Sequence, residues 1–153
     1  MFDPAERQYL ADARVARLAT AGADARPHVV PVCFALTADG IVTPIDEKPK
    51  SVGPTALRRV RDGDANPPVA LVADHYVEDW TGLGWVQVRG TAAVVGPEAS
   101  GHRVAIAALT EKYDQYADHD LATRPVIRIE PGTVRSWGAL EAGPSGPHEG
   151  STR

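Results

Sequence analysis

The chain has 153 residues, which is enough for one domain with its own hydrophobic core. Hydrophobic residues make up 43% of the chain and charged residues 24%, as in ordinary globular proteins, and the net charge is −4. The acidic balance argues against nucleic-acid binding. No apolar run is long enough for a membrane helix, and the first ten residues lack the apolar core of a signal peptide. The single cysteine, Cys33, excludes an internal disulfide and a Cys-rich zinc site, so we expect a cytoplasmic protein.

The first third of the chain predicts one helix and three strands. Asp3-Pro4-Ala5-Glu6 combines a capping residue, a proline at the first helical position and a glutamate three residues after the cap, which predicts a helix ending near Asp12. Apolar patterning predicts strands over 14–21, 27–36 and 41–45, with a hairpin turn at 38–40. Both faces of the second strand are apolar, so it should be covered on both sides, and Pro31 indicates an edge or a bulge.

A cluster of cations follows the third strand. Lys48 and Lys50 are two of only three lysines, and a helix predicted over about 54–61 adds three arginines. A helix N-terminus just after two lysines favours a phosphate, because unpaired N–H groups and the helix dipole both attract negative charge. A solvated loop followed by an ordinary basic helix is an equally weighted interpretation of the same residues.

The second half predicts a sheet closed by a hairpin. We expect a short buried strand over 69–73, a polar and aromatic loop over 74–84, and a long strand over 85–95 whose second face carries Trp85. A helix is expected over 98–113, with an apolar stripe formed by Val104, Ala105, Ala108 and Leu109. After a connector over 114–124, strands over 126–130 and 133–137 should form a hairpin around Pro131-Gly132.

Together these elements predict a mainly β protein, a small antiparallel barrel with peripheral helices. Residues 1–140 should form one domain, and residues 141–153, which are rich in Gly, Pro and Ser, should form a disordered tail.

Polar residues of the loop over 74–84 are weak candidates for a metal site. The spacing of Asp74, His75, Glu78 and Asp79 fits no common set of ligands, so we favour a polar loop and expect no metal. Cys33 lies on an apolar strand and is expected to be an inert, buried thiol. The sequence identifies no catalytic side chain.

Six segments resemble the pyridoxamine-phosphate-oxidase-like split-barrel superfamily, and within it the deazaflavin (coenzyme F420)-dependent oxidoreductases. They occur in the expected order over residues 5–140: Arg14–Thr20, Pro27–Phe34, Asp46–Lys50, Asp74–Trp80, Trp85–Gly90 and Val134–Trp137. The resemblance implies a split β-barrel of the FMN-binding type, and a homodimer with two cofactor sites at the subunit interface.

The resemblance also implies the site residues. Lys48 and Lys50 match the basic pair that holds the cofactor phosphate, and Thr43 matches a hydroxyl residue at the end of the preceding strand. Val32 and Cys33 match strand positions beside the cofactor ring. Trp85 and Trp137 match aromatic positions that border the ring or the substrate, from either subunit.

The implied function is an F420-dependent oxidoreductase that reduces an electron-poor double bond of a small organic substrate by hydride transfer, with solvent able to supply the proton. The alternatives are an FMN-binding oxidase or reductase of the same fold and a non-catalytic protein that binds flavin or deazaflavin. The last predicted strand offers Arg135 and Trp137 in place of the arginine-and-histidine signature of the oxidases, which argues against oxidation of pyridoxamine phosphate. We expect no nucleic-acid or membrane partner.

Overall fold

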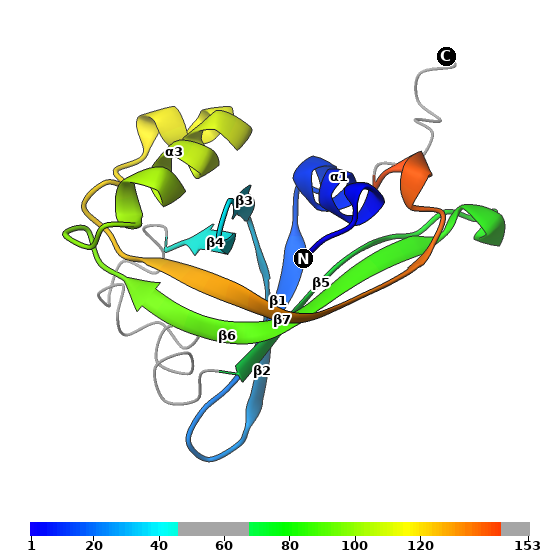
Figure 1. Ribbon diagram of the computed structural model, residues 1–153, viewed down its shortest axis with the longest axis horizontal. Coiled ribbons are helices and arrows are strands. Elements are labelled where there is room, and N and C mark those ends of the chain that lie inside the picture. Colours follow the sequence, from blue (N-terminus) through cyan, green and yellow to red (C-terminus); the bar gives the residue numbers. More distant parts are fainter. Residues whose placement is uncertain (46–67, 145–153) are drawn as a thin grey trace.

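The computed structural model describes residues 1–45 and 68–144, which form a curved antiparallel sheet with two α-helices on one side (Figure 1). The sheet has seven strands in the order β2-β1-β5-β6-β7-β4-β3. The strands are β1 Ala16–Ala21, β2 Pro27–Val32, β3 Ala35–Thr37, β4 Gly40–Pro44, β5 Pro68–His75, β6 Gly84–Val95 and β7 Val126–Gly138. The helices are α1 Pro4–Asp12 and α3 His102–Lys112, with short 3-10 helices η2 Trp80–Gly82, η3 Asp114–Asp118 and η4 Leu140–Ala142. The predicted mainly β barrel with peripheral helices is confirmed.

Helix α1 begins and ends as its sequence predicts. The Asp3 side chain accepts a hydrogen bond from the Glu6 N–H at 2.8 Å, and the Glu6 carboxylate accepts one from the Asp3 N–H at 3.0 Å. These reciprocal bonds satisfy two backbone donors that the first helical turn leaves unpaired. The other Glu6 oxygen accepts a bond from the Ser136 hydroxyl at 2.7 Å, which ties the helix to β7.

The two edge strands of the sheet, β2 and β3, are consecutive in the chain. Only Cys33 and Phe34 separate these two strands, so the sheet must curl until its two edges lie close together. The two edges are joined by the covalent chain and not by a described ladder of hydrogen bonds. The prediction of one strand over 27–36 is therefore wrong, whereas the edge position that Pro31 indicated is confirmed. The expected cover on both faces is also wrong for the single chain, because Val29 is 59% exposed.

The longest ladder joins β6 to β7, and the hairpin predicted around Pro131-Gly132 is wrong. β7 runs unbroken through these residues, with Pro131 opposite Gly90 where the register shifts. An irregular position tolerates a proline because it needs no ladder N–H there. A Cβ added to Gly90 would lie 2.2 Å from the Glu130 carbonyl oxygen, so only glycine fits where β6 and β7 approach each other at this position.

Helix α3 begins four residues later than the prediction and buries a different face. Ala105 and Leu109 are buried as expected, but Val104 is 61% exposed and His102 takes its place in the interior. The His102 Nε2 lies 2.6 Å from the Arg124 carbonyl oxygen, which gives this buried ring a polar partner. The short strand expected over 69–73 is longer, because β5 continues to His75.

Three of the sequence predictions fall wholly or largely outside the described residues. The helix expected over 54–61 lies there, as do Lys48, Lys50 and residues 145–153 of the expected tail. Leu140, at the predicted boundary of the domain, is buried and begins η4. No helix in the described part of the chain is long and apolar enough to cross a membrane.

Candidate cofactor site

The break between β2 and β3 is held rigidly by side chains. Phe34 is fully buried, and its N–H donates to the Tyr113 hydroxyl oxygen at 3.1 Å. The same hydroxyl lies 2.9 Å from the Arg14 carbonyl oxygen and 3.0 Å from that of Phe34. Burial raises the pKa of Tyr113 to about 12, so the hydroxyl keeps its proton at neutral pH. Tyr113 thus takes the place of a strand partner where the ladder is interrupted.

Thr43 completes this arrangement from β4. Its side chain is buried, and its hydroxyl donates to the Cys33 carbonyl oxygen at 2.7 Å. A threonine hydroxyl has one proton, and this bond uses it. Among the predicted site residues, Val32, Cys33 and Thr43 are therefore brought together, with Val32 6% exposed and Cys33 half-buried.

The described chain stops at Ile45, close to this break, and Lys48 and Lys50 come after that residue in the sequence. Pro44 pairs with Val126, and the chain returns at Pro68, which pairs with Thr91. Lys48 follows Thr43 by five residues in the sequence. The positions of the two lysines lie outside the described residues, and their predicted phosphate contact stays a prediction.

Trp85 and Trp137 lie directly opposite each other on β6 and β7. Cross-strand partners in an antiparallel pair have Cβ atoms about 4.5–5.5 Å apart, so the strand register brings together two tryptophans that are 52 positions apart in the sequence. Trp137 is 53% exposed. This pairing could not be predicted from the hairpin expected around Pro131, because one continuous strand sets the register.

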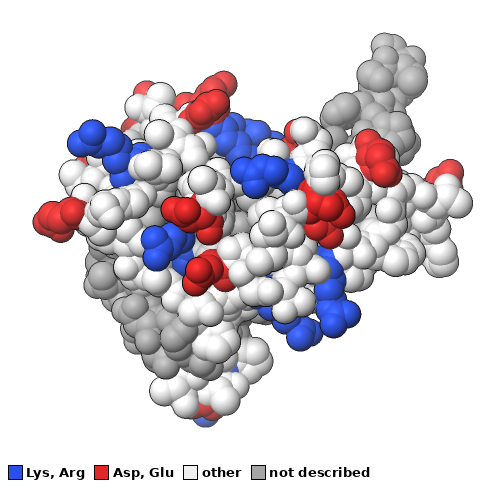
Figure 2. Space-filling model, in the orientation of Figure 1, with Lys and Arg blue, Asp and Glu red and all other residues white. Residues whose placement is uncertain are grey.

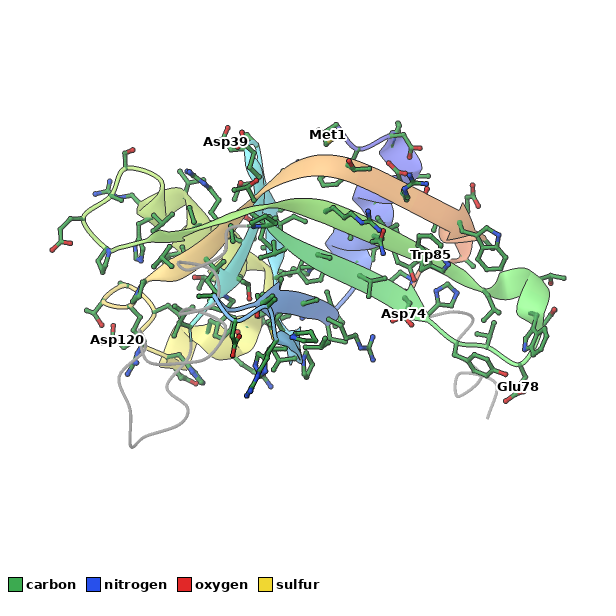
Figure 3. The ribbon with its side chains drawn as sticks, turned by 90° about the horizontal axis from the view of Figure 1, so that it is seen from below. Met1, Asp39, Asp74, Glu78, Trp85 and Asp120 are labelled. Atoms are coloured by element: carbon green, nitrogen blue, oxygen red, sulfur yellow. The ribbon has the colours of Figure 1, made fainter. Side chains whose placement is uncertain are left out.

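The tryptophan pair lies far from the β2–β3 break of the same chain. Thr43 pairs with Ile127, and Ile127 pairs with Val94, nine positions along β6 from Trp85. At about 3.3 Å per residue the two places are about 30 Å apart along the strand. In Figure 3 the labels of Trp85 and Asp74 stand at one end of the long strands, and that of Asp120 stands at the other.

We call these places the tryptophan end (residues 76–85 and 137–138) and the helix end (residues 33–34, 43, 94–95 and 113). At the tryptophan end, Tyr76 is 64% exposed and Trp80 69% exposed. The Trp80 indole N–H donates to the Tyr76 hydroxyl at 3.2 Å, and Asp79 caps η2 by accepting from the Thr81 N–H. The sequence predicts a polar and aromatic loop here, and the structure shows that Tyr76 and Trp80 are its exposed aromatic side chains, although neither was among the predicted site residues.

The polar residues considered as metal ligands have structural partners. Asp74 forms an ion pair with Arg17 at 2.7 Å. His75 uses both ring nitrogens, with the Tyr9 hydroxyl 2.7 Å from Nδ1 and the Gly82 carbonyl oxygen 2.6 Å from Nε2. Burial, and then the charge of Asp74, raise the pKa of Tyr9 to about 12. These contacts fix the base of the tryptophan end against α1.

Lys112, in the last turn of α3, was not among the predicted site residues. Its Nζ donates to the Leu10 carbonyl oxygen at 3.2 Å and lies 3.9 Å from the centre of the Phe34 ring. Arg14, two residues after α1, donates to the Lys112 carbonyl oxygen at 3.1 Å, so a cation caps a C-terminal carbonyl of each helix. Burial, and then the nearby charge of Arg14, lower the pKa of Lys112 to about 8. The one feature of the sequence that distinguishes Lys112 is the rarity of lysine, since the chain has only three.

Charges are mixed on the face of the described residues that Figure 2 shows. Figure 2 shows acidic and basic side chains interspersed over the face in view, without one large field of a single sign.

The fold defines a class, the split β-barrels, in which an antiparallel sheet curls without closing its ladder. The pyridoxamine 5'-phosphate oxidase family model matches residues 2–138, and the chain belongs to that family. Comparison with curated proteins gives no match in sequence.

Three solved structures illustrate the range of proteins that share this fold. A conserved hypothetical protein, Rv2991 from Mycobacterium tuberculosis, is 22% identical, with a TM-score of 0.69 over 100% of this chain and 96% of its own. The heme storage protein HutZ from Vibrio cholerae is 17% identical, with a TM-score of 0.68 over 89% of this chain and 93% of its own. An F420 reductase is 22% identical, with a TM-score of 0.61 over 84% of this chain and 94% of its own. At these identities the likeness establishes the fold and leaves the cofactor open.

Proposed function

We propose that the protein is an F420-dependent oxidoreductase, which reduces an electron-poor double bond of a small organic molecule by hydride transfer. The observation that carries this proposal is the β2–β3 break, where Val32, Cys33 and Thr43 meet beside the entry to the stretch containing Lys48 and Lys50. The family membership and the F420 reductase among the neighbouring folds support it. An FMN-binding oxidase or reductase is the alternative within the same fold, followed by a non-catalytic binding protein.

The described residues fit one wall of a site for a flat, tricyclic ring. Half-buried Cys33 offers apolar surface, Val32 beside it is a core residue that is only 6% exposed, and the backbone at this point is fixed by the Thr43 and Tyr113 hydroxyls. A rigid wall holds a bound ring at a constant distance from an acceptor, which is what near-attack geometry requires. The deazaflavin, when bound, supplies the hydride chemistry, and the protein supplies binding, orientation and exclusion of water.

We also propose that the working protein is a homodimer whose sites combine two chains. Trp85 and Trp137 lie about 30 Å along β6 from the position beside Thr43, so they line the same ring only if a second copy provides them. Exposed apolar side chains support such pairing: Trp137 at the tryptophan end is 53% exposed, and Val29 on the edge strand β2 is 59% exposed. A stable dimer would bury more than about 1,000 Å² in total. Sedimentation that gives a monomer at micromolar concentration would refute this proposal.

Mixed dimers test the two-chain site directly. One chain carries Lys48→Ala and Lys50→Ala, the other carries Trp85→Ala and Trp137→Ala, and each is inactive as a homodimer if both groups act. After unfolding and refolding as an equal mixture, half the dimers are mixed and each has one intact site, which restores about a quarter of the wild-type activity. A site formed within one chain would restore none.

The cofactor is identified by titrating the purified protein with F420, FMN and hemin, followed by absorbance and by turnover with reduced F420 and conjugated acceptors. We expect saturable binding of F420 and acceptor-dependent oxidation of its reduced form. Binding of FMN alone, with peroxide formation under oxygen, would favour the oxidase alternative. Binding of F420 without turnover of any acceptor would favour the non-catalytic alternative, and a strong Soret band with hemin alone would place the protein with the heme-binding members.

The phosphate contact has its own test. Removing a charged hydrogen bond costs about 1.5–3 kcal/mol, so Lys50→Ala should weaken F420 binding roughly ten- to a hundredfold. Arg26→Ala is the control, because Arg26 is an exposed cation that pairs with Asp24 on a turn away from the break. Unchanged affinity in the Lys48→Ala/Lys50→Ala variant would remove the two lysines from the site.

A further inference from the structure

A groove between α1 and α3 lies next to the β2–β3 break and is not used by the proposed cofactor chemistry. Its volume is about 410 Å³, which is within the range of small-ligand pockets. It is lined by Arg7, Ala11, Ala35, Leu36, Ala108, Glu111 and Lys112. Short apolar side chains from both helices and from β3 form most of the lining, and the charged groups are two cations and one carboxylate.

The two cations have no ion-pair partner in the described part of the chain. The ion pairs found there are Arg17–Asp74 and Arg26–Asp24, and neither Arg7 nor Lys112 belongs to one. The Lys112 ammonium group has three N–H donors and gives one to the Leu10 carbonyl oxygen, while the Phe34 ring covers another side. A half-buried ammonium group with donors to spare is a natural partner for a carboxylate.

The charges around Lys112 explain why a bound anion would be favourable. Burial and the charge of Arg14 lower the pKa of the amine, and the influence of nearby Cys33 and Asp12 only partly opposes them. Glu111 is the one carboxylate that lines the groove, and its side chain is exposed. A ligand carboxylate beside the amine would favour its protonated form, so ligand binding and proton uptake are coupled.

We propose that the groove between α1 and α3 binds a small monocarboxylate with a short alkyl chain, its carboxylate at Lys112 and its chain against Leu36 and the flanking alanines. Inorganic phosphate would leave the apolar lining without a partner, and an alkylammonium ion would be repelled by the two cations. A larger cavity of about 660 Å³ at the start of α3 fits this ligand less well, because its cation, Arg103, is exposed and its charge is screened by water.

The test is a calorimetric titration of the full chain with hexanoate, 1-hexanol, hexylammonium and inorganic phosphate. We expect saturable binding of hexanoate and at least about tenfold weaker binding of the other three, because each lacks the charge or the chain that the groove recognises. At pH 8 the heat of hexanoate binding should depend on the ionisation enthalpy of the buffer, since Lys112 takes up a proton. Above pH 9 hexanoate binding should weaken, because the amine, with its pKa of about 8, is then largely neutral before binding.

Variants locate the ligand. Lys112→Gln should lose hexanoate binding at least about tenfold, and Lys112→Arg should retain most of it. Because Lys112 also caps α1, a second variant leaves that contact intact: Ala11→Phe adds a ring to an exposed position of the lining and should block the groove. Arg103→Gln removes a charge from the same helix at the larger cavity and should have no effect, and the Lys48→Ala/Lys50→Ala variant should still bind hexanoate.

Equal affinity for hexanoate and 1-hexanol would overturn the proposal, since it would show an apolar cleft without anion recognition. Unchanged binding in Ala11→Phe would also overturn it, and loss in Arg103→Gln would place the ligand at the larger cavity. Loss of hexanoate binding in the Lys48→Ala/Lys50→Ala variant would move the anion to the predicted phosphate site. The proposed oxidoreductase activity is measured separately, so either proposal can fail without the other.

Discussion

The helix end and the tryptophan end are the two ends of the same β6–β7 ladder. Aromatic side chains are buried at the helix end and exposed at the tryptophan end. At the helix end Phe34 is fully buried and the Tyr113 and Thr43 hydroxyls complete the backbone hydrogen bonds at the strand break. At the tryptophan end Trp80 and Trp137 are more than half exposed. We therefore expect substitutions at the helix end mainly to lower the stability of the fold, and substitutions at the tryptophan end mainly to weaken assembly and activity.

The largest expected effect on stability is at Phe34. Truncating a fully buried aromatic side chain removes its packing and leaves a cavity, so Phe34→Ala should lower the free energy of unfolding by about 3–5 kcal/mol. Urea denaturation followed by fluorescence measures the change. Phe34→Leu is the matched control and should cost clearly less, and a loss below about 1 kcal/mol for Phe34→Ala would show that this break is not part of the core.

The next largest effect concerns Tyr113. Tyr113→Phe keeps the ring but leaves the buried Phe34 N–H without its acceptor, which should cost about 1–3 kcal/mol. Amide hydrogen exchange should accelerate at Phe34 more than at a β6 amide such as that of Val88. Tyr116→Phe, on the neighbouring and half-buried tyrosine, tests whether the effect belongs to the hydroxyl at the break.

Thr43 should show a smaller cost in stability and a separate effect on the site. Thr43→Val is nearly isosteric and removes the bond to the Cys33 carbonyl oxygen, which should cost about 1 kcal/mol. Thr43→Ser keeps the hydroxyl and should retain cofactor affinity better than Thr43→Val. Equal F420 affinity in both variants would show that the hydroxyl does not position the ring-facing strand.

The smallest expected effect on stability is at Trp137. Because this side chain is 53% exposed in the single chain, Trp137→Ala should change the stability of the monomer by less than about 0.5 kcal/mol. If a second chain covers it, the same variant should raise the dimer dissociation constant at least about tenfold, as loss of a buried interface tryptophan does. Sedimentation over a range of concentrations measures this, with Trp80→Ala as the comparison at the same end. If Trp137→Ala instead lowered stability strongly and left assembly unchanged, Trp137 would be a residue of the fold and not of the dimer interface.

The sequence by itself determined the elements whose signals are local. The capping box of Asp3 and Glu6 defined α1, and alternating apolar residues predicted most strands, because these patterns depend on residues within a few positions of one another. The family resemblance gave the barrel and the order of its parts, and the family membership is confirmed.

Only the tertiary structure decided the features that depend on residues far apart in the chain. Pro131-Gly132 suggested a turn, but the close approach of Gly90 to the Glu130 carbonyl makes it an irregular position within one strand. That strand then sets Trp85 opposite Trp137 and separates both from Thr43. The partners of Lys112 lie at Leu10 and Phe34, about 100 and 80 positions away, so no local pattern could reveal that its charge is half-buried and its pKa lowered.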